Sequence, residues 1–421
     1  MNDSCFFVTG AAGFVGRQLC RRLRAAGHRV RGLVRRGDSD LEAIGVEVVR
    51  GDLAAPVEWQ DSLAGVDYVI HCAARAAYGR GREYEAANVT GTHHVLAAAR
   101  RAGGGLRRFV FVSTIGAVDR GAGDDCAAPL DGRSPSHPSS DYGRSKGEAE
   151  QLVRASGLPF SIVRPALVVG GAMRPDSHFA VFVRAALRGS LLARFAWPGR
   201  FSVVHVDDLA AALELCATHP AAAGRTFFCA GAPVALGDCF AQACPGRWRM
   251  SMSWAAQAAR QWPRLVPFRM KALLLPALTA SDADLQELGW RAQHPAGEAL
   301  QEVIARERAR LDPEADPGGQ TVVTGAASGL GRALVARLAR HRRQLLLVDR
   351  DQAGLEQVWA EHPHCRVGVV DLADAAAVAA FVRGADWTAH PVRELFACAG
   401  FGLRGPVLAA DPAQHARLFQ V

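Results

Sequence analysis

A tyrosine and a lysine stand four residues apart in the segment "YGRSK", at Tyr142 and Lys146. In a helix this spacing places both side chains on one face. A free tyrosine has a pKa of about 10 and is a poor acid–base catalyst near neutral pH, and a neighbouring ammonium lowers that pKa. The chain has four tyrosines and only two lysines, so the pattern favours a proton-transfer pair. The alternative interpretation is an incidental pair at an exposed helix start.

A hydroxyl group is expected close to this pair. The apolar segment "FVFVSTIGAV" predicts a strand that ends at Ser113 and Thr114. A hydroxyl at a strand end can orient a substrate carbonyl opposite the tyrosine, and Thr114 is our choice, with Ser113 as the alternative. The hydroxyl that is not catalytic would cap the following turn.

Short apolar segments alternate with helical segments along the first part of the chain, which predicts an α/β fold with a doubly wound parallel sheet. This regularity loosens after residue 172, so we expect a smaller substrate region over 172–312. The segment "LDPEADPGG" then interrupts a charged helix and predicts a linker at 313–318. The alternation begins again after it, which predicts domains at 1–312 and 319–421.

Two glycine-spaced loops, "TGAAGFVG" and "TGAASGLG", each follow an apolar strand and open a helix. Glycines there permit a tight turn and let the backbone approach a pyrophosphate at the positive end of the helix. We therefore predict two dinucleotide-binding loops, although each alone could be an ordinary turn. Their glycines are Gly10, Gly13 and Gly16 in the first loop and Gly325, Gly329 and Gly331 in the second.

The residue that ends the second strand of each unit predicts which dinucleotide is bound. Asp349 in the second unit would hold the adenosine ribose hydroxyls. Val34 stands at the equivalent place in the first unit and is followed by Arg35 and Arg36, which would pair with a 2′-phosphate. We therefore predict NADP(H) for 1–312 and NAD(H) for 319–421, unless the two arginines are only surface charge.

A nicotinamide dinucleotide would complete the proton-transfer pair. An oxidised nicotinamide ring beside Tyr142 would lower its pKa further, and Lys146 could donate to the nicotinamide ribose. Asp52 of "GDL" and Asp371 of "VDL" recur at equivalent places and would hydrogen-bond the adenine edge.

Composition argues against several function classes. The net charge of +8 comes from arginines scattered through helical segments, without the aromatic residues of a nucleic-acid-binding motif. Ten dispersed cysteines include no CxxC pair, so we expect no metal site and no disulfide framework. There is no signal-peptide pattern and no apolar run long enough to span a membrane. We expect a cytoplasmic protein that acts on a small molecule.

Residues 1 to about 310 resemble an extended short-chain dehydrogenase/reductase. The resemblance rests on segments that occur in the family's order: "TGAAGFVG", "GDL", "VIHCAA", "NVTGT", "FVSTIGAV", "YGRSK", "RPALVVG" and "VHVDDLA". It implies a Rossmann-like fold with Asn88 beside the nicotinamide, and it implies that His205 and Asp208 lock the late part of the fold. The further residues that it places at the cofactor are Phe14, Val15, Leu53, Ala73, Ala74 and Pro165.

Within that family, Arg164-Pro165 of "IVRPALVVGG" is similar to the 3β-hydroxysteroid dehydrogenase and dihydroflavonol reductase branch. This resemblance implies an NAD(P)-dependent oxidoreductase that interconverts a hydroxyl and a ketone on a lipophilic molecule, such as a steroid, a flavanonol or a β-keto acyl compound. One alternative is a nucleotide-sugar epimerase or dehydratase, and another is a non-catalytic module that senses NADPH. A homodimer would be usual for the family.

The second unit resembles the start of a compact short-chain dehydrogenase, through "TGAASGLG", "VDRD", "VDLAD" and "ACAG". Ala397 and Cys398 replace two amides that the family carries in the last of these motifs. The segment has no Tyr-x-x-x-Lys motif. We interpret it as a partial Rossmann unit that binds nucleotide, either as a pseudo-domain or as part of a truncated fusion.

Residues 247–276 contain three tryptophans and several arginines. One interpretation is a hydrophobic lid or a contact with a membrane surface. We favour a packed pair of helices in the substrate region, because Pro263 and Pro267 would break a long amphipathic helix.

Overall fold

The structure is a computed structural model that describes residues 4–76, 81–120, 126, 128–311, 320–339, 344–387 and 390–400. The chain divides into two compact units, Met1–Glu307 and Arg308–Val421. The predicted linker at 313–318 lies outside the described residues, and so does the end of the second unit.

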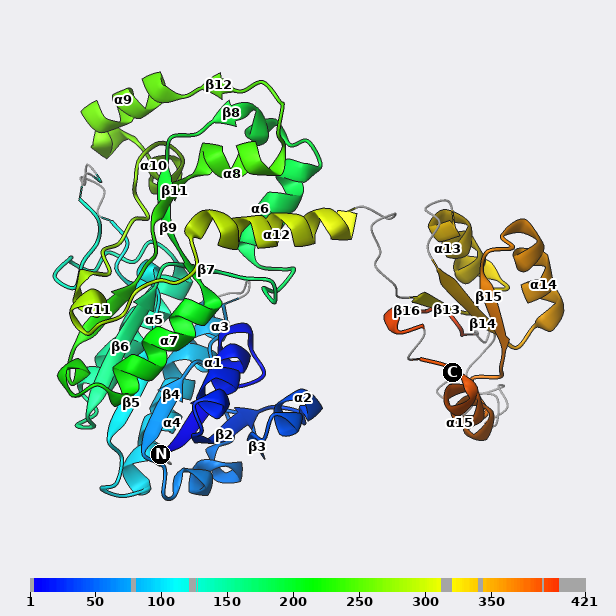
Figure 1. Cartoon of the computed structure of the whole chain (residues 1–421), viewed down its shortest axis with the longest axis horizontal. Coiled ribbons are helices and arrows are strands. Elements are labelled where there is room, and N and C mark those ends of the chain that lie inside the picture. Colours follow the sequence, from blue (N-terminus) through cyan, green and yellow to red (C-terminus); the bar gives the residue numbers. More distant parts are fainter. Residues whose placement is uncertain are drawn as a thin grey trace, which may run out of the picture. The chain divides into compact units, whose positions relative to one another are not determined.

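Unit 1 is built on a seven-stranded sheet with the order β10-β6-β5-β4-β1-β2-β3, as Figure 1 shows. All its neighbouring strands are parallel, as the alternating pattern predicts. The strands are β1 (Cys5–Thr9), β2 (Arg29–Val34), β3 (Glu47–Arg50), β4 (Tyr68–His71), β5 (Arg108–Val112), β6 (Phe160–Pro165) and β10 (Thr226–Cys229).

Helices cover both faces of this sheet because neighbouring strand residues point to opposite sides. Phe6 packs in one core with residues of α1 (Phe14–Ala25) and α7 (Val206–Thr218). Phe7 packs in the other core, with residues of α4 (Gly91–Arg101) and α5 (Asp141–Arg154). The shorter helical segments of this part are α2 (Ser39–Ala43), η1 (Pro56–Glu58), η2 (Gln60–Leu63), α3 (Gly81–Tyr84), a π-helical segment η3 (Glu85–Thr90), η4 (Ile115–Ala117) and η6 (Pro220–Ala222).

The rest of unit 1 forms a smaller region with its own hydrophobic core, while α7 and β10 of the predicted range 172–312 belong to the large sheet and its cover. It contains a three-stranded sheet, β11-β9-β7, and a two-stranded sheet of β12 and β8. Its strands are β7 (Leu167–Val169), β8 (Phe195–Ala196), β9 (Arg200–His205), β11 (Pro233–Ala235) and β12 (Met250–Ser251). Its helices are α6 (His178–Leu187), η5 (Leu191–Arg194), α8 (Leu236–Ala243), α9 (Ser253–Gln261), η7 (Pro263–Leu265), α10 (Phe268–Leu274), α11 (Ala283–Glu287) and α12 (Ala296–Leu311).

Unit 2 has a four-stranded parallel sheet with the order β15-β14-β13-β16. Its strands are β13 (Gln320–Thr324), β14 (Leu345–Asp349), β15 (Arg366–Val369) and β16 (Val392–Ala397), and its helices are α13 (Gly329–Ala339), α14 (Gln352–Glu361) and α15 (Ala375–Gly384). In the described parts of both units, every helix is too short or too polar to cross a bilayer.

Candidate active site

The first glycine loop connects β1 to α1 and has the geometry of a dinucleotide cradle. Gly10 has a φ of +67°, and a Cβ on it would lie 2.8 Å from the Cα atom of Ala73. A Cβ on Gly16 would lie 2.1 Å from the Gly10 carbonyl oxygen, so only glycine lets α1 begin this close to the turn. Gly13 caps α1 without a side chain, and Phe14 and Val15 form its first turn. These residues fit a pyrophosphate at the helix N-terminus.

The end of β2 carries the charges that were predicted to select the dinucleotide. Val34 is buried, whereas Arg35 and Arg36 are exposed directly after the strand. The next carboxylate, Asp38, accepts the backbone N–H of Leu41 and pairs with Arg17 at 2.5 Å, which lowers the pKa of Asp38. Asp38, the carboxylate nearest in sequence to Arg35 and Arg36, is therefore paired with Arg17. The assignment of Arg35 and Arg36 to a 2′-phosphate stays a prediction.

The other predicted cofactor residues follow β3 and β4, next to the loop. Asp52 is exposed and accepts the N–H of Ala54, while Leu53 lies against Gly91 at the start of α4. The N–H of Ala73 donates to the Thr9 hydroxyl at 3.1 Å, and Ala74 beside it is exposed. Their contact with a cofactor stays a prediction.

Helix α5 carries Tyr142 and Lys146 and begins where the sequence predicts. Ser140 caps it by accepting the N–H of Gly143. A Cβ on Gly143 would lie 2.1 Å from the Gly116 carbonyl oxygen in η4. The glycine therefore lets α5 pack directly against the segment that follows Thr114. This contact holds the start of α5, which carries Tyr142, next to the turn that Thr114 caps.

Lys146 is almost fully buried, with 1% of its surface exposed. Its ammonium nitrogen lies 4.0 Å from the centre of the Phe111 ring on β5. Burial lowers the pKa of Lys146 to about 7, while the carboxylate of Glu150 and the thiol of Cys72 act in the opposite direction. The lysine therefore changes charge close to neutral pH.

The pKa of Tyr142 differs from the sequence-based expectation. Burial raises the pKa of Tyr142 to about 12, and the neighbouring Tyr84 acts in the same direction. The ring centroids of the two tyrosines are 5.9 Å apart. The expectation that Lys146 lowers this pKa is wrong for the protein by itself. Desolvation disfavours the phenolate, and Lys146, with its own pKa of about 7, is uncharged at the pH where this phenol would ionise. Tyr142 is therefore a protonated phenol at neutral pH.

Ser113 and Thr114 have different environments. Ser113 is buried, and its hydroxyl donates to Glu150 at 2.6 Å. Thr114 is only partly buried, and its side-chain oxygen accepts the N–H of Gly116 at 3.2 Å as it caps η4. The Ser113 hydroxyl is thus committed to the protein interior, which favours Thr114 as the residue that faces a substrate.

Glu150 is a residue that the sequence analysis missed. Its carboxylate is 1% exposed and receives two hydrogen bonds from Arg164 at the end of β6, at 2.8 and 2.7 Å. Arg154 also donates to it at 2.8 Å. Glu150 therefore fixes α5 to the end of β5 through Ser113 and to the end of β6 through Arg164. It stands one helical turn after Lys146. Its spacing of four residues from Lys146 was a visible signal.

Asn88 is buried in the π-helical segment η3 and links two parts of the site. Its amide nitrogen donates to Ser145, the neighbour of Lys146, at 3.0 Å, and its amide oxygen accepts the N–H of Arg75 at 2.8 Å. Its proximity to the nicotinamide stays a prediction.

His71 at the end of β4 is a second residue that the sequence analysis did not single out. Its ring nitrogens lie 2.6 Å from the Thr9 hydroxyl and 3.0 Å from the Thr92 hydroxyl. Burial and the charge of Lys146 lower the pKa of His71 to about 3. The ring is therefore neutral and joins the glycine loop to α4.

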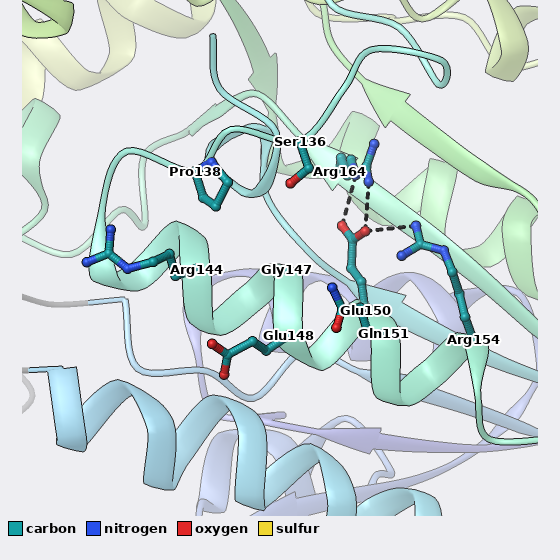
Figure 2. Close-up of a pocket in the computed structure, with 9 residues that line it drawn as sticks. All are labelled: Ser136, Pro138, Arg144, Gly147, Glu148, Glu150, Gln151, Arg154 and Arg164. Atoms are coloured by element: carbon teal, nitrogen blue, oxygen red, sulfur yellow. Dashed lines mark hydrogen bonds and ion pairs between the residues drawn. The ribbon is translucent and has the colours of Figure 1, made fainter. Parts of the chain in front are cut away.

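A pocket of about 330 Å³ lies along α5 and includes Glu150 and Arg164 (Figure 2). It is also lined by Arg144, Gly147 and Gln151, which the helical period places away from Tyr142 and Lys146. Figure 2 shows Arg154 and Arg164 converging on the carboxylate of Glu150. This pocket is therefore separate from the predicted chemical site.

His205 and Asp208 lie at the start of α7. Asp208 is buried and accepts the backbone N–H groups of Gln293 and His294, each at 3.0 Å. The ring of His205 stacks on that of His294, with centroids 4.1 Å apart. Both residues hold the segment before α12 against α7, as the resemblance implied.

In unit 2 the second glycine loop repeats the cradle of the first. Gly325 has a φ of +65°, and a Cβ on Gly331 would lie 2.1 Å from the Gly325 carbonyl oxygen. Gly329 also has a positive φ, of +50°. Asp349 accepts the N–H of Ala327 at 3.0 Å, and Asp371 accepts the N–H of Ala373. The geometry fits a dinucleotide, whose binding here stays a prediction.

Comparisons with known proteins agree with this geometry. Residues 6–230 match the NAD dependent epimerase/dehydratase family, and residues 320–421 match the short chain dehydrogenase family. A 2-alkyl-3-oxoalkanoate reductase of Shewanella oneidensis is 31% identical over 242 residues, which span 53% of this chain and 60% of that protein.

A second relative is a 4-hydroxy-2-methyl-3-oxo-4-farnesyl-3,4-dihydroquinoline-1-oxide ketoreductase of Stigmatella aurantiaca. It is 35% identical over 243 residues, which span 55% of this chain and 69% of that protein. A solved short-chain dehydrogenase/reductase superfamily protein of Agrobacterium tumefaciens with bound NAD is 27% identical, with a TM-score of 0.56 over 74% of this chain and 99% of that one. The glycine cradle, the parallel sheet and a family match over more than half of its length show that the chain belongs to the NAD dependent epimerase/dehydratase family.

Proposed function

We propose that unit 1 is an NADP(H)-dependent oxidoreductase that interconverts a hydroxyl and a ketone on a lipophilic small molecule. The observation that carries this proposal is the packing of Gly143 against Gly116, which holds the start of α5, where Tyr142 stands, against the segment η4 that Thr114 caps. The Arg164-Pro165 motif supports the substrate class. So do the two relatives, whose names describe reductases of 3-oxo compounds with alkyl or farnesyl groups.

The dinucleotide, when bound at the first glycine loop, supplies or accepts the hydride. In the reductive direction Tyr142 donates its phenolic proton to the substrate oxygen, for which it is in the correct protonation state at neutral pH. Thr114 orients that oxygen toward the phenol. In the oxidative direction the same phenol must first lose its proton, and the raised pKa of Tyr142 opposes this step in the protein alone.

Lys146 supplies positive charge below about pH 7 and can donate a hydrogen bond at higher pH. Its buried position over Phe111 holds the ammonium group at the end of β5. Glu150 is a positioning residue, because it holds α5, Ser113 and Arg164 together without facing the substrate.

The test is NADPH consumption by the full chain with a panel of β-keto acyl compounds, hydroxysteroids and flavanonols. We expect turnover of at least one lipophilic ketone. Tyr142→Phe should lower kcat by about 10²–10⁴-fold, the contribution of a general acid, while NADPH still binds. Tyr68→Phe, which alters a buried phenol on β4, is the matched control. Full turnover by Tyr142→Phe would remove Tyr142 from the mechanism.

The two alternatives give different results in the same assay. A nucleotide-sugar epimerase or dehydratase would keep a nicotinamide dinucleotide through purification and convert a nucleotide sugar without net NADPH consumption. A sensing module would bind NADPH and convert none of the substrates.

A further inference from the structure

The exposed apolar side chains of unit 1 gather at one end of it. We call this end the cap and define it as residues 177–206 and 239–281. In the described part of unit 1, every large apolar side chain that is exposed belongs to the cap, except Val57. The members in the cap are Val181, Leu191, Leu192, Trp248, Met250, Trp254, Trp262, Leu265 and Met270.

The exposure of these side chains is large. Trp248 is 75% exposed, Trp254 is 69% exposed and Leu265 is 79% exposed. Helix α9 exposes Trp254, because Ala256 and Ala259 are the residues of this helix that pack in the core. Several large apolar side chains exposed on neighbouring segments indicate a binding surface. The expectation of an ordinary packed helix pair is therefore incomplete: the helices pack, but Trp254 of α9 and Met270 of α10 are exposed.

Segments that are distant in the sequence form this surface together. Strand β12 pairs with β8, so that Met250 stands beside Phe195. The segment η5, with Leu191 and Leu192, leads directly into β8. Helices α9 and α10 contact each other. Figure 1 shows α8, α9, β8 and β12 together at the end of unit 1 away from the large parallel sheet.

The charge of the cap is predominantly positive, although exposed Asp176 and Asp238 directly precede its two ranges. The sequence contains no Asp or Glu at 177–206 or at 239–281. Among the described residues of the cap, six arginines are exposed: Arg188, Arg194, Arg200, Arg247, Arg260 and Arg264. Tryptophan rings settle at the boundary between water and lipid, and arginine stems reach from that boundary to anionic head groups. A surface rich in tryptophan, leucine and arginine and poor in carboxylates is complementary to an anionic bilayer.

We propose that the cap docks unit 1 on the surface of an anionic lipid bilayer. Helices α9 and α10 are only nine and seven residues long, so the contact is interfacial and spans nothing. Arginines attract the anionic head groups, and Trp254, Trp262 and Leu265 enter the interface. The docked enzyme would receive a substrate that is dissolved in the membrane, and this role rests on the proposed function. The docking itself does not.

The experiment is co-sedimentation of the full chain with two kinds of vesicle and without substrate. We expect binding to vesicles of equal parts phosphatidylcholine and phosphatidylglycerol, and at least about tenfold weaker binding to phosphatidylcholine alone, since each arginine near an anionic surface adds to the attraction. Arg260→Glu with Arg264→Glu should remove this preference. Trp254→Ser with Trp262→Ser should weaken binding to both kinds of vesicle.

Trp359→Ser is the matched control, because it removes an exposed tryptophan of α14 in unit 2 and should leave vesicle binding unchanged. The proposal is overturned if the native chain does not sediment with the mixed vesicles, or if Trp359→Ser reduces binding as much as the cap variants do. It is also overturned if Trp254→Ser with Trp262→Ser leaves vesicle binding unchanged and changes only the oligomeric state measured by sedimentation velocity. That result would identify a protein interface. Absence of turnover with every substrate would contradict the proposed function and leave this result unaffected.

Discussion

The two glycine loops of this chain have nearly the same geometry but different surroundings. The first glycine has a φ of +67° in unit 1 and +65° in unit 2, and in each loop a Cβ on the last glycine would lie 2.1 Å from the carbonyl oxygen of the first. In unit 2 Asp349 accepts an N–H of the loop, whereas the equivalent position in unit 1 is Val34, followed by two arginines.

The larger difference lies beyond the loops. Unit 1 adds helix α5, which carries Tyr142 and Lys146 and is fixed by Gly143 and Glu150. The sequence of 319–421 contains neither a tyrosine nor a lysine. The following predictions test which contacts of unit 1 join its glycine loop to the residues that are proposed to transfer a proton.

The largest effect is expected for Glu150→Gln, which leaves two arginines facing a neutral amide. Breaking a buried ion pair by removing one partner destabilises a protein by about 3–5 kcal/mol. We expect a loss at the lower end of this range, because the glutamine amide can still accept a hydrogen bond. Because α5 would lose its attachment to β5 and β6, we expect kcat to fall more than KM rises. Chemical denaturation and steady-state kinetics measure the two effects.

Glu148→Gln is the control for Glu150→Gln, since Glu148 is exposed on the same helix. It should leave stability and kcat unchanged. A Glu150→Gln protein with native stability and native kcat would show that α5 is positioned by other contacts.

Gly16→Ala and Gly331→Ala are matched substitutions at equivalent places in the two loops. Each added Cβ would meet a backbone oxygen at 2.1 Å, and such overpacking costs typically about 1–3 kcal/mol. If turnover depends on the first cradle, Gly16→Ala should lower NADPH affinity and kcat/KM by roughly 10–100-fold. Gly331→Ala should leave turnover unchanged. Equal loss of activity in both variants would contradict the assignment of the chemistry to unit 1.

Local patterns were sufficient to predict much of unit 1. Apolar runs predicted the parallel strands, and the four-residue spacing placed Tyr142 and Lys146 on α5, because both features depend on the periods of strands and helices. The glycine cradle could also be predicted, since its geometry is contained within a few residues of chain.

Contacts between distant segments could not be predicted in this way. The hydrogen bond from Ser113 to Glu150 requires β5 beside α5, and the contact of Gly143 with Gly116 requires α5 packed on η4. The raised pKa of Tyr142 depends on how much water the folded chain excludes. For the same reason the exposed Trp254 of α9 could not be told from a core residue by its spacing.

The charge of Lys146 gives a pH-dependent prediction. Its pKa is about 7 in the folded chain and its ordinary value is 10.5, so between these pH values the unfolded chain holds a proton that the folded chain lacks. The free energy of unfolding of the native chain should therefore rise relative to Lys146→Met by about 1.4 kcal/mol per pH unit above pH 7, and stay parallel to it below. Denaturation at several pH values measures this difference. Arg144→Met, on the exposed face of α5, should follow the native profile.

The smallest effect concerns the choice between dinucleotides, where the two units are predicted to differ. Replacing Arg35 and Arg36 by Asp and Ser should weaken NADPH binding and favour NADH, because a carboxylate repels a 2′-phosphate and can accept from ribose hydroxyls. The loss of one charge-assisted hydrogen bond corresponds to a change of roughly tenfold or more in the ratio of kcat/KM for NADPH to that for NADH. Arg21→Ser, an exposed arginine on α1, is the control and should leave the ratio unchanged. If the double variant keeps the native ratio, Arg35 and Arg36 are only surface charge. The residues after β2 would then not select NADPH over NADH.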